Sequence, residues 1–82
     1  MGFNSVTLTP EQVEALNRSF STMRHDINNF LSLMVAASEL IKFSPGSIEQ
    51  MSKTLSEQPP KISASIAKFA DELEKALGIA RR

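Results

Sequence analysis

Apolar residues recur at alternating intervals of three and four positions from residue 13 to residue 41. This heptad spacing places them along one side of an α-helix that packs against another helix. Neither glycine nor proline occurs between Pro10 and Ser44, so the pattern predicts one helix over about residues 10–43. The apolar positions are Val13, Leu16, Phe20, Met23, Ile27, Phe30, Met34, Ala37 and Ile41.

The start of this helix is marked by several residues that favour a helix N-terminus. Thr9 is suited to cap the helix, Pro10 to occupy its first position, and Gln12 to complete a capping box with Thr9. We therefore expect residues 1–8 to form a flexible leader and residues 9–82 to form a single helical-hairpin domain.

A second long helix is predicted after the breaker Ser44-Pro45-Gly46-Ser47. Ser47 and Gln50 have the spacing of another capping box. Pro59-Pro60 should break or kink a helix. The apolar phase passes through both prolines unchanged, which favours two coaxial segments or one helix kinked at residues 59–60 over a long loop, so the second helix is expected over about residues 48–80. The apolar rows of this helix are Ile48, Leu55, Ile62, Phe69 and Ala76, and beside them Ile66, Leu73 and Ala80.

The fold class expected from this pattern is all-α, an antiparallel two-helix hairpin that homodimerises into a four-helix bundle. Two helices joined by a turn at residues 44–47 bury their apolar sides against one partner only. The C-terminal half of the first helix carries further apolar residues on other sides, namely Leu31, Leu33, Val35, Ala36 and Leu40. A second copy of the chain would cover this surface.

Composition narrows the functional classes. Nine basic and nine acidic residues give a formal net charge of zero, which does not favour nucleic acid as a partner. Cysteine is absent and histidine occurs once, so thiolate and multi-histidine metal sites are excluded. No apolar run is long enough to insert into a membrane. We expect a cytoplasmic protein that contains no metal site and no cofactor of its own.

The stretch His25-Asp26-Ile27-Asn28-Asn29 is the main candidate functional site. Ile27 belongs to the apolar side, whereas His25 lies at the heptad position farthest from it and Asn29 lies one turn later on the same outer strip. A neutral imidazole is a competent nucleophile toward a phosphoryl group, and a neighbouring carboxylate can accept its proton. The sequence contains no nucleotide-binding motif, so the phosphoryl group must come from another domain or protein.

The segment Met23-Arg24-His25-Asp26-Ile27-Asn28-Asn29-Phe30-Leu31 resembles the phosphoacceptor box of bacterial sensor histidine kinases. In that family a His, an acidic residue, two variable positions and an Asn or Thr occur in order on the first helix of a dimerisation hairpin. The resemblance covers about residues 10–80 in architecture. It implies His25 as the phosphoacceptor, Asp26 as the residue that assists proton removal, and Asn29 as the residue that helps position water for dephosphorylation.

The partners implied by this resemblance are a second copy of the chain and a response-regulator receiver domain, with a kinase ATPase domain as a further candidate. ATP and Mg²⁺ would act only through that separate catalytic domain. One alternative is a structural or scaffolding homodimeric hairpin with no covalent chemistry. Another is a peptide-binding module that uses the apolar surface of the first helix.

Overall fold

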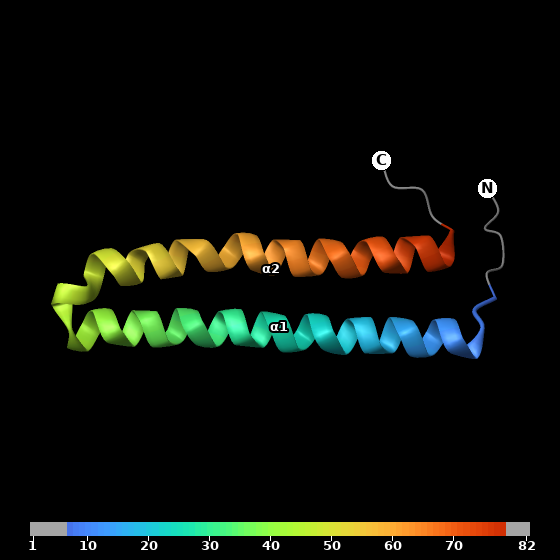
Figure 1. Cartoon of the computed structure of the whole chain (residues 1–82), viewed down its shortest axis with the longest axis horizontal. Helices are drawn as coiled ribbons and strands as arrows, with labels where there is room; N and C mark the ends of the chain where they lie inside the picture. Colours follow the sequence, from blue (N-terminus) through green and yellow to red (C-terminus); the bar gives the residue numbers. More distant parts are fainter. Residues whose placement is uncertain (1–6, 79–82) are drawn as a thin grey trace, which may run out of the picture.

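The computed structural model describes residues 7–78 and is all-helical, as the sequence predicted (Figure 1). Two long helices, α1 (Pro10–Phe43) and α2 (Ile48–Leu77), are connected by a short 3₁₀ turn, η1 (Pro45–Ser47). The two helices lie side by side and run in opposite directions, so the molecule is an elongated rod of 58 × 26 × 15 Å. The expected leader falls largely on residues 1–6, which lie outside the described residues.

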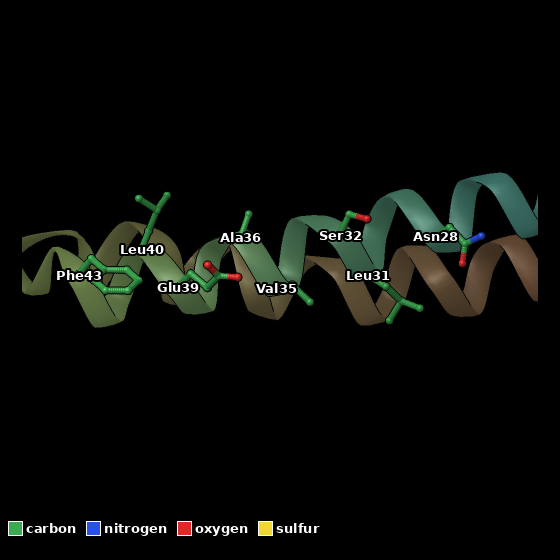
Figure 2. Close-up of a pocket in the computed structure, with 8 residues that line it drawn as sticks. All are labelled: Asn28, Leu31, Ser32, Val35, Ala36, Glu39, Leu40 and Phe43. Atoms are coloured by element: carbon green, nitrogen blue, oxygen red, sulfur yellow. The ribbon is translucent and has the colours of Figure 1, made fainter.

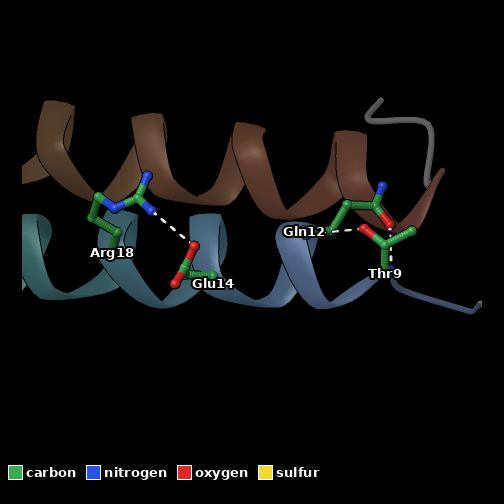
Figure 3. A network of polar contacts seen from close by, with 4 residues as sticks. All are labelled: Thr9, Gln12, Glu14 and Arg18. Carbon is green, nitrogen blue, oxygen red and sulfur yellow. Dashed lines mark hydrogen bonds and ion pairs between the residues drawn. The ribbon is translucent and has the colours of Figure 1, made fainter.

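The predicted capping box at the start of α1 is confirmed. The Thr9 hydroxyl accepts a hydrogen bond from the Gln12 backbone N–H at 3.1 Å, and the Gln12 side chain accepts one from the Thr9 N–H at 2.8 Å (Figure 3). One turn later, Arg18 and Glu14 form an exposed ion pair at 3.4 Å. The cap satisfies two backbone donors that the first helical turn would otherwise leave to water.

The predicted capping box at the start of α2 is wrong. Ser47 makes no side-chain cap bond to the helix. Its hydroxyl instead donates to the carbonyl of Ser44 at 2.7 Å and lies 3.4 Å from that of Leu40. The reason is local geometry: Ser47 ends the 3₁₀ turn with φ −94° and ψ 4°, whereas a capping residue normally has extended backbone angles that aim its oxygen at the helix.

α2 continues through Pro59 and Pro60 as one helix. It stops at Leu77 because Gly78 adopts the left-handed conformation, with φ 71°, and its N–H reaches the carbonyls of Glu74 and Lys75. The predicted end near residue 80 lies outside the described residues.

The contact between α1 and α2 is formed by the predicted apolar rows. The rings of Phe20 and Phe69 pack with their centroids 5.4 Å apart, in the tilted geometry that aromatic pairs favour. Most residues of these rows are half-buried, and in residues 7–78 only Ala37 and Gln58 are buried, each 2% exposed. A single layer of two helices leaves these apolar rows partly open to solvent, because each helix packs against only one other helix.

Large apolar side chains remain exposed on both helices. Stepping 100° per residue around each helix places most of these side chains to the same side of the rod. On α1 they are Val13, Phe20, Leu31 and Val35, and on α2 they are Ile48 and Ile66. Leu33, Leu40 and Phe43, the last 76% exposed, lie elsewhere around the C-terminal half of α1.

Candidate functional site

His25 lies near the middle of α1 with its side chain exposed. Two residues later, Ile27 is half-buried on the side that faces α2. Because successive helical residues are about 100° apart, His25 points roughly opposite to that contact. The imidazole is therefore open to a large partner approaching α1 from outside.

The structure brings His25 and Asn29 together. The amide nitrogen Nδ2 of Asn29 lies 3.4 Å from Nε2 of His25, one helical turn away. An amide nitrogen can only donate, so the contact is a hydrogen bond when Nε2 is unprotonated and the imidazole proton sits on Nδ1. In that tautomer the lone pair of Nε2 accepts from the Asn29 amide, so this nitrogen can act as a nucleophile once the amide moves off it.

Asp26 is placed apart from this pair. Its side chain is half-buried and lines a groove between α1 and α2, which we call the interhelical groove. Within residues 7–78, no hydrogen bond or ion pair joins the Asp26 carboxylate to the imidazole, because neighbouring residues of a helix point about 100° apart. The groove is lined by Ala15, Arg18, Ser19, Thr22, Met23 and Asp26 of α1 and by Ser65, Lys68, Phe69 and Glu72 of α2.

Arg24, which precedes His25, is directed to another group. Its guanidinium lies over the Phe20 ring, 5.7 Å from the ring centroid, within the range of a cation–π contact. This contact directs the Arg24 charge away from His25 and toward Phe20, which lies about one turn earlier and packs on Phe69. Arg24 is thereby a structural neighbour of the His25–Asn29 pair rather than a member of it.

A second groove runs along α1 from Asn28 to Phe43 and is largely apolar (Figure 2). Its lining side chains project from α1 alone, so it is a surface of one helix and has no wall from α2. We call it the C-terminal groove of α1. It is lined by Asn28, Leu31, Ser32, Val35, Ala36, Glu39, Leu40 and Phe43.

Two features of the site region were missed in the sequence. The first is the contribution of Ser65 and Lys68 to the groove that holds Asp26, since the pairing of the helices could be fixed only once both were placed. The second is the burial of Gln58. A signal for it was present, because Gln58 falls three residues after Leu55 and four before Ile62, in the apolar phase of α2.

Among the described residues, no group of three or more His, Cys, Asp or Glu side chains is placed to hold a metal ion. In that same part of the chain, neither helix combines the length and apolar character needed to cross a lipid bilayer.

Comparison of the chain with protein-family models, with curated proteins and with solved structures gives no match.

Proposed function

We propose that the chain is a histidine phosphotransfer and dimerisation domain of two-component signalling, in which His25 exchanges a phosphoryl group with a receiver-domain aspartate. The observation that carries this proposal is the exposed imidazole on the outer side of α1 with the Asn29 amide 3.4 Å from Nε2. The resemblance of residues 23–31 to the histidine kinase phosphoacceptor box agrees with it.

The reaction requires only groups that the pair and its partner provide. The Nε2 lone pair of His25 attacks the phosphorus of an aspartyl phosphate, a new N–P bond forms, and the P–O bond to the receiver carboxylate breaks. The Nδ1 proton is then lost to solvent or to a carboxylate, a role that Asp26 takes if its side chain turns out of the interhelical groove. The Asn29 amide must move off Nε2 and can then donate to a phosphoryl oxygen or to water.

The dimer is part of the same proposal. Exposed apolar side chains gather on one side of the rod, and a second copy placed against that side forms a four-helix bundle. The interhelical groove and the His25–Asn29 pair lie off that side and remain accessible in the dimer. We also place the protein in the cytoplasm, where receiver domains and ATP are available.

A phosphorylation assay tests the covalent step. Incubation with a phosphorylated receiver domain, or with a histidine kinase and ATP, is expected to give an acid-labile, base-stable phosphoprotein. His25→Gln is expected to abolish the label. Asn17→Ala, an exposed substitution two turns earlier on α1, is the control and is expected to retain it. Absence of label across a broad receiver and kinase panel would reject the phosphotransfer function.

A structural homodimer without covalent chemistry is the second candidate function. The observation that favours it is the exposed apolar surface, which calls for a partner whether or not His25 reacts. It predicts a stable dimer in solution, no phosphohistidine in the assay above, and no effect of His25→Gln on association.

A further inference from the structure

The middle of α2 differs from the rest of the helix in its backbone hydrogen bonds. Pro59 and Pro60 lie inside the helix and have no N–H. They therefore cannot donate to the carbonyls of Leu55 and Ser56, and their rings crowd those two carbonyls. Two consecutive helical hydrogen bonds are missing at this turn.

Side chains around this turn bond to backbone carbonyls of their own helix. Thr54 Oγ1 donates to the Gln50 carbonyl at 3.3 Å, and Ser56 Oγ donates to the Lys53 carbonyl at 2.9 Å. Gln58 Nε2 donates to the Thr54 carbonyl at 2.8 Å. Hydroxyl back-bonding of this kind competes with the backbone ladder and bends helices. The segment Thr54–Pro60 is thus the place at which α2 deforms most readily.

Gln58 adds a reason for the helix to deform there. Its side chain is 2% exposed, and its Oε1 is buried without a hydrogen-bond partner in the part of the chain that the structure describes. A buried acceptor with no donor raises the free energy of the arrangement in which Gln58 is buried. A bend that opens the turn to water would satisfy this oxygen and the two carbonyls together.

This turn lies directly behind the candidate site. The Phe20–Phe69 contact fixes which residues of the two antiparallel helices are level with each other. Counting nine residues from this pair on each helix, toward the connection η1, brings Asn29 level with Pro60. The weak turn of α2 therefore supports the part of α1 that carries Asn29.

We propose that α2 bends at Thr54–Pro60 and that this bend regulates the reactivity of His25. The regulation of His25, unlike the bend, rests on the proposed phosphotransfer function. In the form that the structure shows, Gln58 is buried and α2 holds the Asn29 turn of α1 in place. In the bent form, Gln58 Oε1 reaches water and α2 withdraws behind Asn29, which shifts the amide relative to Nε2. The balance between forms sets how often the Asn29 amide covers the nucleophile.

Amide hydrogen exchange of the full chain, followed by NMR, tests the bend. The amides of residues 61–63, the first donors after the prolines, are expected to exchange at least about tenfold faster than those of residues 26–28 at the same level of α1. Equal protection of the two segments would overturn the bend.

Replacing both prolines tests the link to His25. Pro59→Ala with Pro60→Ala restores two donors and is expected to slow exchange of residues 61–63 about tenfold, with Pro45→Ala as the control proline outside both long helices. The ratio of phosphotransfer to phosphohistidine hydrolysis is expected to change severalfold. An unchanged ratio together with slower exchange would overturn regulation of His25. A wild-type protein that never forms phosphohistidine overturns the phosphotransfer function, whereas the exchange pattern decides the bend by itself.

Discussion

Single polar side chains in this protein have effects that depend on where the helices place them. Thr9 and Gln12 satisfy one another's backbone donors at the exposed start of α1. Gln58 has the same amide chemistry as Gln12 but is buried with one oxygen unsatisfied. We expect the first amide to stabilise the folded chain and the unsatisfied oxygen of the second to destabilise it, because only a buried acceptor loses its contact with water.

Thr9→Ala is expected to lower the free energy of unfolding by about 1 kcal/mol. The substitution removes the hydroxyl that accepts from the Gln12 N–H, and it weakens the reciprocal bond from the Thr9 N–H to the Gln12 side chain. Urea unfolding followed by circular dichroism measures the change. Thr7→Ala, outside the helix and exposed, is the control and is expected to leave the midpoint unchanged. Equal midpoints for the two variants would show that the box contributes nothing.

Gln58→Leu is expected to raise the free energy of unfolding by about 1–3 kcal/mol, because a buried acceptor without a partner is replaced by an apolar group of similar size. The thermal midpoint of the variant measures it, with Gln50→Leu as an exposed control on the same helix. A lowered midpoint for Gln58→Leu alone would mean that its bond to Thr54 outweighs the unsatisfied oxygen.

The two helices differ in how their ends and middles are built. α1 has a capping box at its start and no internal breaker, whereas α2 starts from a 3₁₀ turn, contains two prolines and ends at a left-handed glycine. The stability of α2 therefore depends more on its contact with α1 than on its own local signals.

Gly78→Ala is expected to destabilise the chain by about 1 kcal/mol, because an L side chain is strained at the φ of 71° that ends α2. Gly46→Ala is the matched control: its φ is not in that region and nothing lies within 4 Å of the added Cβ. Chemical unfolding of both variants checks the difference. Equal stability would indicate that α2 continues past residue 78 when alanine permits it.

The sequence predicted the elements better than it predicted the site. Two long helices and the Thr9 cap followed from heptad spacing and capping chemistry, which are local. The Ser47 cap was mispredicted because the 3₁₀ turn, a matter of backbone angles, decides where its hydroxyl points. The separation of Asp26 from His25, and its place in a groove that it shares with Lys68, required the pairing of the two helices.

The whole molecule is a two-helix layer with apolar side chains left exposed along one side. Among the described residues, only two are buried, far fewer than a self-sufficient core contains. Association is therefore expected to contribute much of the stability of the folded chain, and stability should rise with protein concentration.

Leu31→Lys with Val35→Lys is expected to convert the dimer into a monomer, because two charges would enter the proposed interface. Light scattering at micromolar concentration measures the change in mass. Ala64→Lys places a charge on the outer side of α2 and is expected to leave the dimer intact. A wild-type protein that is already monomeric would contradict the bundle.

The antiparallel arrangement also determines how the molecule responds to tension. The helix ends at Pro10 and Leu77 lie together at the end of the rod opposite the turn (Figure 1). A force that separates these ends breaks the contacts between α1 and α2 one after another, rather than all at once. The Phe20–Phe69 stack would break before the level of Asn29 is reached, and the turn at residues 44–47 last. A pull from that end would thus loosen the surroundings of His25 while the two helices remain paired in the half of the rod next to η1.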